Sequence, residues 1–473
     1  MRKQRLKVGL AGVMCTPFRG DKEGAFAASG VALEALANAL DFELHVVAQG
    51  VYTLDQAKAA AAELDAWGAD FVLLQASSFA AGEFIYPFAE LSARLGLWAI
   101  PEGPPTEEGG LPLNSMAAVN MYASILGTRV PHYDRPVKWF YGHAGQHQFD
   151  ERLTVTVRAL TALVNLQGAR VGLVGGVAPG FDNLIVDPVR LRSRLGIEVV
   201  PVSFNTLLRR AQGYDAAGVR AAADHIREGA LEVEKGQETA LEKSGRVYLA
   251  CRDLVEELDL DALAISCWPR FQEAYHLAVC TVVGQLNADR LVTACEGDVA
   301  SAVSMLALHA MSDDVVTLMD LSGIDEAEDR VLLWHCGPTA PQLASDAGVR
   351  LGALWLFDGY GGPPMGLRND LVLRPGPVTV MGIVPDLDRM LVIEGKIAED
   401  APPYVGSRGW LTDMRVADHP VTVPDLLQTL LGAHYPHHYP LVYGQYAHAS
   451  LELAAWLGIS PIMPRAYTPY LLP

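Results

Sequence analysis

Short apolar runs that alternate with stretches of helical length most strongly constrain how this chain folds. The runs at residues 6–13, 43–48 and 70–75 are separated by alanine-rich amphipathic segments at 25–40 and 54–66. Strands that are apolar on both faces and alternate with helices are typical of a parallel sheet covered by helices on both sides. The N-terminal part of the chain is therefore predicted to form a doubly wound α/β domain.

A second round of the same alternation follows a segment rich in Gly, Pro and Glu. Strands are predicted at 169–174 and 197–202, and a long charged helix is predicted at 216–243. We therefore expect an N-terminal α/β domain over 1–164 and a second doubly wound parallel α/β domain over 165–345.

The last part of the chain has a different composition, in which Gly and Pro are frequent. Its apolar runs at 378–383, 390–393, 421–423 and 439–443 are not separated by long helical segments. This spacing favours antiparallel pairing over a doubly wound sheet. The expected fold is thus α/β, with two doubly wound parallel domains followed by a smaller, mainly antiparallel β-rich domain over 346–473.

Composition narrows the possible partners. The chain has 36 Lys and Arg against 55 Asp and Glu, a net charge of −19. Nucleic acids and anionic membrane surfaces are bound by clustered basic side chains, so neither is an expected partner. No apolar run approaches the roughly 18 residues of a membrane span. Six cysteines without a C-x-x-C pair are typical of the reducing cytoplasm, which is the expected location.

A glycine-rich element follows the strand predicted at 169–174. Gly175, Gly176 and Gly180 do not have the G-x-G-x-x-G order of dinucleotide sites, and Pro179 removes one backbone donor. A phosphate site is the weaker alternative, because turns of other spacings also bind phosphate. The favoured interpretation is a tight turn that needs glycine for close approach, with no nucleotide cofactor.

Two carboxylates stand between a predicted strand and a predicted helix. Glu296 and Asp298 follow the apolar run at 291–294 and precede the helical segment 299–311. Ligands of α/β proteins commonly bind at such strand ends. Asp298 suits a helix N-cap, so that Asp298→Asn is expected to be mild. Glu296 lies before the cap and has no such structural role.

Asp320 and His335 close the next two apolar runs, at 315–319 and 331–334, and His438 precedes the run at 439–443. Since the ends of neighbouring strands converge, we expect these side chains to meet. A lone histidine at such a position is more commonly a packed core residue. Buried unpaired charges cost several kcal/mol, however, and a metal ion removes that cost. A mixed carboxylate and imidazole set suits Mn²⁺, Co²⁺ or Mg²⁺, and Zn²⁺ remains possible.

These residues resemble the L-fucose isomerase and L-arabinose isomerase superfamily of metal-dependent aldose–ketose isomerases. The family's Glu-x-Asp turn matches Glu296-Gly-Asp298, its metal-binding Asp matches Asp320, and its late H-x-x-x-x-Y-G pattern begins at His438. The arabinose isomerases add a histidine at the end of the next strand, which His335 matches. The resemblance covers mainly 260–340 and 430–458.

The resemblance implies a function and roles for individual residues. An aldose and its ketose would interconvert through an ene-diol, with Glu296 and Asp320 as catalytic proton carriers and no redox cofactor. The implied metal ligands are Glu296, Asp320, His438 and His335, and the implied substrate contacts are Trp268, Gln272, His437 and, more weakly, Arg19. It also implies a homotrimer or homohexamer in which the first domain completes a neighbour's pocket.

Two other functions remain open from the residues alone. The same ligands could activate water in a metal-dependent hydrolase or lyase that acts on a carbohydrate. Alternatively, the chain could be a sugar-binding family member that has lost activity. The sugar itself is also open, because a pentose, a 6-deoxyhexose and an anionic hexose all fit the polar and aromatic residues near the site.

Overall fold

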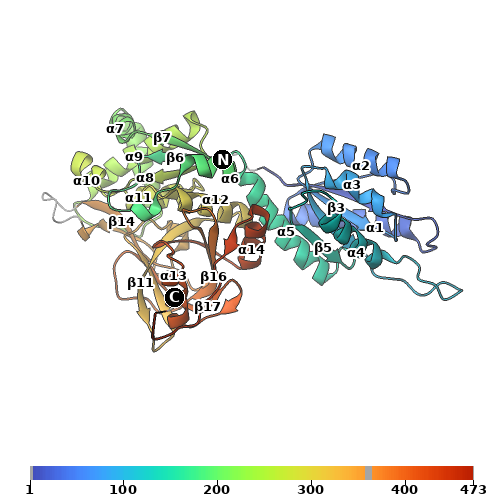
Figure 1. Cartoon of the computed structure of the whole chain (residues 1–473). Helices are drawn as coiled ribbons and strands as arrows, with labels where there is room; N and C mark the ends of the chain where they lie inside the picture. Colours follow the sequence, from blue (N-terminus) through green and yellow to red (C-terminus); the bar gives the residue numbers. More distant parts are fainter. Residues whose placement is uncertain (1–3, 357–364, 472–473) are drawn as a thin grey trace. The chain divides into compact units, whose positions relative to one another are not determined.

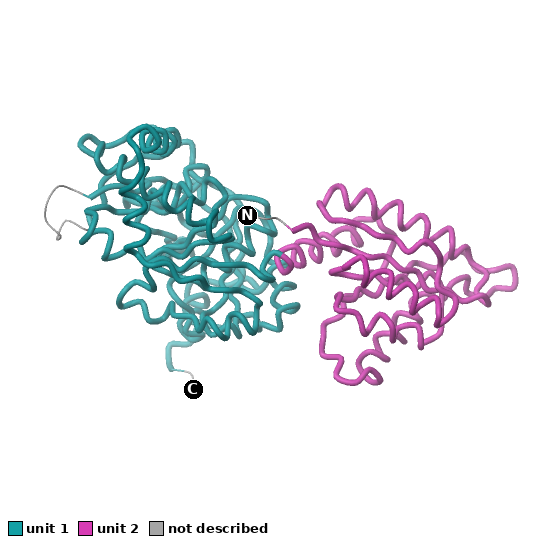
Figure 2. Tube along the Cα trace, turned by 90° about the horizontal axis from the view of Figure 1, so that it is seen from above, with its two compact units in different colours: residues 1–3, 165–473 teal, residues 4–164 magenta. Residues whose placement is uncertain are grey.

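The computed structural model describes residues 4–356 and 365–471, which form two compact units (Figure 2). One unit comprises Gln4–Val164, and the other contains the described residues from Asn165 onward. The second α/β segment and the β-rich segment, expected as separate domains, lie together in this larger unit. The division into three domains stays a prediction.

The smaller unit contains a five-stranded parallel sheet with the order β2-β1-β3-β4-β5. Helices cover both faces of this sheet (Figure 1), as the surroundings of Gly9 and Gly12 in β1 show. An added Cβ at Gly9 would meet Leu64 of α2, whereas one at Gly12 would meet Phe26 of α1. The two positions point to opposite faces because side chains alternate along a strand. The strands are β1 (Lys7–Val13), β2 (Glu43–Val46), β3 (Phe71–Ala76), β4 (Arg94–Ala99) and β5 (Val137–Tyr141), and the helices are α1 (Lys22–Leu40), α2 (Leu54–Trp67), α3 (Ile85–Ala89), α4 (Ser115–Thr128) and α5 (His147–Leu166), which ends in the larger unit.

The larger unit begins with a four-stranded parallel sheet of order β10-β9-β6-β7. The helical stretch predicted at 216–243 is divided between two helices, because α8 ends at a Gly229 cap and a short strand intervenes before α9. The strands of the parallel sheet are β6 (Arg170–Val174), β7 (Glu198–Val202), β9 (Ala262–Ile265) and β10 (Thr293–Ala294), whereas the short strand β8 (Glu232–Val233) belongs to the sheet described next. The helices are α6 (Pro188–Leu195), α7 (Phe204–Gln212), α8 (Ala216–Glu228), α9 (Glu238–Glu257), α10 (Arg270–Tyr275) and α11 (Cys280–Ala288).

Six antiparallel strands of the larger unit close into a barrel, in the order β16-β15-β19-β11-β12-β17, with β17 pairing back to β16. These strands are β11 (Val316–Asp325), β12 (Arg330–His335), β15 (Gly376–Ile383), β16 (Arg389–Ile397), β17 (Ser407–Val416) and β19 (His438–Tyr443). Further strands extend the sheet, namely β8, β13 (Arg350–Ala353), β14 (Gly366–Val372), β18 (His419–Pro420) and β20 (Ser460–Pro461).

Two sequence expectations for this region are wrong. The runs at 315–319 and 331–334 belong to the barrel instead of the second parallel sheet. The short turn between Asp325 and Arg330 permits only an antiparallel hairpin, since parallel strands need a long crossover. The run at 421–423 is not a strand either, because Thr422 caps α13 (Val423–Gly432) in a capping box with Asp425.

A buried helix, α12 (Val299–Ser312), packs against the parallel strand β9 and against β15 and β19 of the barrel. Every residue of this helix from Val299 to Met311 is buried. A helix that is apolar on all sides is typical of a core element. Its first turn therefore lies where the parallel sheet and the barrel meet. The last helix is α14 (Ala447–Leu457).

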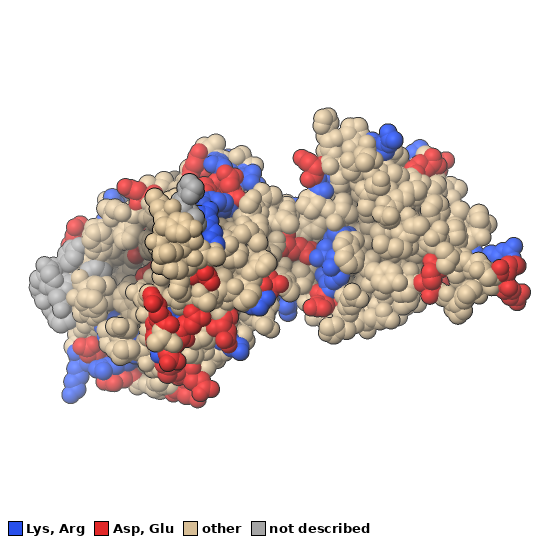
Figure 3. Space-filling view, turned by 60° about the horizontal axis from the view of Figure 1, so that its bottom comes forward, with Lys and Arg blue, Asp and Glu red and all other residues tan. Residues whose placement is uncertain are grey.

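None of the described helices is both long and apolar enough to cross a membrane. On the face drawn in Figure 3, Asp and Glu gather on the larger unit, and Lys and Arg form no broad field. That distribution agrees with the net charge of −19.

Candidate functional site

The first part of the site is the turn between β10 and α12, which holds Glu296. Glu296 has a φ of 60° and Gly297 a φ of 74°, so both lie in the left-handed region. A Cβ at Gly297 would meet the carbonyl oxygen of Gly176 at 2.2 Å. The glycine-rich turn thus packs backbone to backbone against the Glu296 turn, and Ala178 N–H donates to the Glu296 carbonyl (2.9 Å). A non-glycine residue held at positive φ is strained, and such strain is common at functional sites.

The barrel supplies the second part of the site. Asp320 of β11 and His438, the first residue of β19, are direct cross-strand partners. The Asp320 Oδ1 and His438 Nε2 atoms lie 3.9 Å apart, and Glu296 Oε2 lies 3.3 Å from the same His438 nitrogen. The structure therefore brings together three residues that are far apart in the sequence.

Two buried polar atoms at this point lack hydrogen-bond partners within the part of the chain that the structure describes. They are Asp320 Oδ1 and His438 Nε2, the pair separated by 3.9 Å. A buried polar atom without a partner costs roughly 1–3 kcal/mol. A divalent ion that binds carboxylate oxygen and imidazole nitrogen would satisfy both atoms, and Glu296 Oε2 lies 3.3 Å from His438 Nε2. The residues present therefore fit the expected metal ion.

His437 contacts the Glu296 carboxylate, whereas the sequence predicted it only as a substrate contact. The Asn183 amide donates to His437 Nδ1 (3.2 Å), and His437 Nε2 donates to Glu296 Oε2 (3.1 Å). Phe181 packs against the His437 ring, with the ring centroids 5.5 Å apart. Phe181 and Asn183 follow the glycine-rich turn. The position of this turn after a strand was the one sequence signal that could have marked them as site residues. Because Nδ1 of a neutral His437 accepts from Asn183, the ring proton lies on Nε2, and His437 donates it to Glu296.

His335 ends β12 and is buried next to His438, with the ring centroids 5.8 Å apart. Cys336 N–H donates to His335 Nδ1 (2.8 Å), which leaves the proton of a neutral ring on Nε2, 3.1 Å from Cys295 Sγ. To bind a metal ion, His335 would have to give up one of these contacts. Its role as a ligand stays a prediction.

Two cysteines contact His335 and two more contact those cysteines, a cluster that was not predicted. Cys295 and Cys336 contact the His335 ring, and the Cys280 and Cys336 sulfur atoms are 3.4 Å apart. The contact with Cys267 and burial both raise the pKa of the Cys295 thiol well above its ordinary value. The Cys280 contact and burial do the same for the pKa of Cys336. The Cys295 and Cys336 thiols are therefore protonated at neutral pH in the metal-free protein.

Burial and neighbouring charges shift the pKa values of Glu296, His438 and His335 in different directions. Burial alone would raise the pKa of Glu296, but the contacts with His437 and His438 outweigh it and hold this pKa well below its usual range. Burial would lower the pKa of His438, yet the Asp298 and Glu296 carboxylates raise it to about 10. Burial lowers the pKa of His335. Glu296 is thus an ionised carboxylate at neutral pH.

The remaining predicted substrate contacts lie in different places. Trp268 is half-buried in the turn after β9, at the same sheet edge as Glu296. Gln272 is buried and its amide donates to the carbonyls of Cys267 and Leu277 (both 3.2 Å), so that it fixes this turn. Arg19 belongs to the smaller unit, where it pairs with Glu108 (3.0 Å) at the surface.

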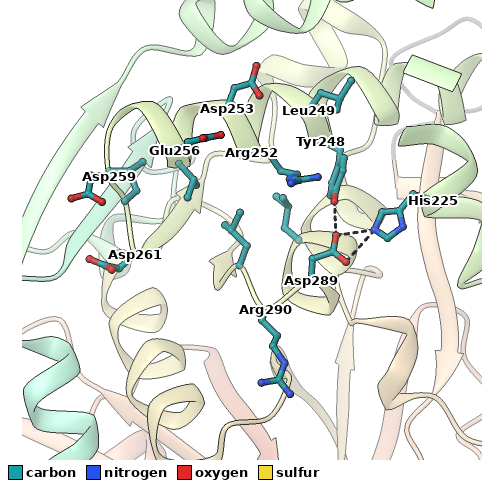
Figure 4. A pocket seen from close by; sticks show the side chains of 14 residues that line it. His225, Tyr248, Leu249, Arg252, Asp253, Glu256, Asp259, Asp261, Asp289 and Arg290 are labelled. Carbon is teal, nitrogen blue, oxygen red and sulfur yellow. Dashed lines mark hydrogen bonds and ion pairs between the residues drawn. The ribbon is translucent and has the colours of Figure 1, made fainter. Parts of the chain in front are cut away.

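A separate cavity of about 790 Å³ lies between α9 and α11 (Figure 4). Asp289 accepts hydrogen bonds from Tyr248 Oη (2.6 Å) and from His225 Nε2 (3.0 Å). This cluster joins α8, α9 and α11. None of the residues predicted as metal ligands lines this cavity.

Known proteins similar to this chain are sugar isomerases. The chain is 27% identical over 395 residues to the sulfoquinovose isomerases of Priestia aryabhattai and Priestia megaterium, across 82% of this chain and 84% of each relative. It is 26% identical over 379 residues to the sulfoquinovose isomerase of Alkalicoccus urumqiensis, across 79% and 81% of the two chains. No protein-family model matches the chain.

A solved structure, a substrate-binding protein of a sugar ABC transport system from Bordetella parapertussis 12822, matches with 16% identity. It covers 57% of this chain and 71% of that chain with a TM-score of 0.18, which supports no assignment. The sulfoquinovose isomerases, by contrast, confirm the expectation that this chain is an intramolecular oxidoreductase, an isomerase that interconverts an aldose and its ketose.

Proposed function

We propose that this chain is a metal-dependent isomerase that converts sulfoquinovose into its ketose by an ene-diol proton transfer. The observation that carries the proposal is the meeting of Glu296, Asp320 and His438 around two buried atoms that lack partners. Their order along the chain also supports the likeness to the fucose and arabinose isomerases.

Glu296, Asp320 and His438 are the residues that would hold a divalent ion, with Mn²⁺ the first candidate and Co²⁺ or Mg²⁺ the alternatives. When bound, such an ion polarises the carbonyl group of an open-chain sugar. The turn around Gly297 and the pairing of β11 with β19 fix the carboxylates relative to the imidazole.

The two carboxylates are suited to move the proton between the adjacent sugar carbons. Glu296 is ionised at neutral pH, so that it is available as a base. His437 donates to the same carboxylate and holds its orientation. Asp320, whose Oδ1 atom lies 3.9 Å from His438 Nε2, is the second proton carrier.

The names of the relatives favour the anionic hexose among the three sugar classes. A sulfonate is bound best by a guanidinium or by several N–H donors. Arg19 is exposed and is the proposed contact, reached from the smaller unit of a neighbouring subunit in a homotrimer or homohexamer. Trp268 is proposed to contact the sugar, and the six free cysteines are consistent with a cytoplasmic location.

Incubation of metal-stripped and Mn²⁺-loaded protein with sulfoquinovose, glucose, L-fucose and L-arabinose tests this proposal. We expect ketose formation from sulfoquinovose only in the presence of metal, with deuterium from D₂O entering the product. A hydrolase or lyase would instead cleave a carbohydrate bond and yield no ketose. Full isomerase activity in rigorously metal-free protein would overturn the proposed metal dependence.

A further inference from the structure

The two carboxylate oxygens of Asp298 make different contacts. Oδ1 accepts from the backbone N–H of Ser301 (2.9 Å), which caps α12. Oδ2 accepts from the Ser301 hydroxyl (2.6 Å) and from His438 Nδ1 (2.8 Å). Asp298 is 1% exposed and His438 is fully buried. The predicted cap is therefore present, but the same side chain also contacts the central histidine of the site.

The second contact decides which nitrogen of His438 carries the proton. A carboxylate only accepts hydrogen bonds, so the ring must be protonated at Nδ1. A neutral His438 then has its lone pair on Nε2, the atom that faces Asp320 at 3.9 Å and Glu296 at 3.3 Å. Histidines that bind metals commonly donate their other N–H to a carboxylate in this way.

We infer that Asp298 is a positioning residue that sets the tautomer and ring angle of His438, so that Nε2 is free to bind the metal ion. The inference rests on the metal ion of the proposed function, although it concerns a residue outside the ligand set. It replaces the expectation that Asp298 is mainly a helix cap and that Asp298→Asn is mild.

Asparagine separates the two tasks of this side chain. Its single carbonyl oxygen can cap α12 about as well as aspartate does. The amide nitrogen must then face His438 Nδ1 and donate to it, which moves the ring proton to Nε2 and blocks metal binding. If the amide turns around, its N–H₂ group faces the Ser301 N–H and the cap is lost.

Ser301→Ala is the matched control. It removes the hydroxyl that donates to the same Oδ2 atom but leaves the backbone cap and the His438 contact in place. Asp298→Ser is an independent second variant, because a serine hydroxyl caps the helix but is too short to reach His438.

The test is Mn²⁺ binding to EDTA-stripped wild-type, Asp298→Asn, Asp298→Ser and Ser301→Ala proteins by titration calorimetry, with thermal unfolding of each metal-free protein. We expect both Asp298 variants to bind Mn²⁺ about 10- to 100-fold more weakly, while Ser301→Ala binds within about threefold of wild type. Above about pH 10, where His438 is neutral, metal-free Asp298→Asn should unfold near the wild-type temperature, which separates positioning from capping.

Two outcomes would overturn different claims. Equal Mn²⁺ affinity of wild type and both Asp298 variants would overturn the positioning role and leave the proposed metal site standing. A wild-type protein that binds neither Mn²⁺, Co²⁺ nor Mg²⁺ would overturn the metal ion of the proposed function, and the positioning role with it.

Discussion

The two compact units bury polar side chains in different ways. In the smaller unit, Gln75 donates to Ser29 (2.8 Å) and accepts from Ser77 (2.8 Å), and no buried side-chain oxygen or nitrogen among residues 4–164 lacks a partner. In the larger unit, eight buried side-chain atoms lack a hydrogen-bond partner in the described chain, and two of them, Asp320 Oδ1 and His438 Nε2, lie 3.9 Å apart. The first arrangement is complete as it stands, whereas in the second the proposed metal ion would satisfy both atoms.

Removal of the proposed base should have the largest effect in this comparison. Glu296→Gln keeps the shape and one oxygen of the side chain but cannot accept a proton, so turnover should fall about 10²–10⁴-fold while Mn²⁺ still binds. Asp320→Asn should behave in the same way. Steady-state kinetics with saturating Mn²⁺, together with metal analysis, provides the measurement.

Asp325→Asn is the control for Asp320→Asn, because the same substitution on the same strand β11 weakens an ion pair with Arg330 and touches none of the candidate ligands. Its turnover should be close to that of wild type. Near-normal turnover of Glu296→Gln would place the base on another residue.

The stability of the metal-free protein should depend on pH through His438 and Glu296, which both belong to the larger unit. The folded state raises the pKa of His438 from 6.5 to about 10, so its protonation gives stability that is complete below pH 6.5 and is lost as the pH rises toward 10. Glu296 acts in the opposite direction, since its lowered pKa gives stability that is present above 4.5 and is lost as the pH falls through the folded pKa.

Urea unfolding of metal-free wild type and His438→Gln between pH 6.5 and 10 measures the histidine effect. We expect wild type to lose more stability than the variant across this range. Parallel curves for the two proteins would show that His438 carries no such charge.

Metal addition should stabilise the larger unit alone. At a free Mn²⁺ concentration of about 100 times Kd, a single site adds roughly 2.7 kcal/mol to the free energy of unfolding. Hydrogen exchange with and without Mn²⁺ should show slower exchange at β11, β19 and the start of α12, and unchanged exchange in β1 and β3. Equal slowing in both units would remove the contrast between them.

Gln75→Met, in the smaller unit, should lower stability and leave the metal site unchanged, which is the reverse of the effect expected for Glu296→Gln. The substitution keeps the volume but leaves Ser29 and Ser77 without this partner, which costs about 1–3 kcal/mol of stability. Mn²⁺ affinity and turnover should not change, because Gln75 contacts none of the candidate ligands. Urea unfolding and calorimetry check the two halves of this prediction, and a loss of Mn²⁺ affinity would contradict it.

The alternation of strands and helices was enough to predict the parallel sheets, because apolar runs and amphipathic helices are local patterns. The same runs could not reveal that β11 and β12 form a hairpin of the barrel, since a buried apolar run is equally compatible with either kind of sheet. Pairing depends on the connection, and the short turn before Arg330 was the available signal.

The candidate ligands Glu296, Asp320 and His438 could be named from their positions after apolar runs and from the family resemblance. The contacts of Asp298 and Asn183 could not, because each depends on a partner far away in the sequence: His438 for Asp298 and His437 for Asn183. Asp298 had a sufficient local explanation as a helix cap, and its local role concealed the second one.

The central claim is that the two buried atoms without hydrogen-bond partners, on Asp320 and His438, bind a divalent ion together with Glu296. Anomalous scattering from crystals grown with Mn²⁺ tests it most directly, since it locates the ion independently of activity. The account predicts a single strong peak in contact with Asp320 Oδ1, His438 Nε2 and the Glu296 carboxylate. A fully active protein whose crystals show no peak there, or show the ion only at the Asp289 cavity, would contradict it.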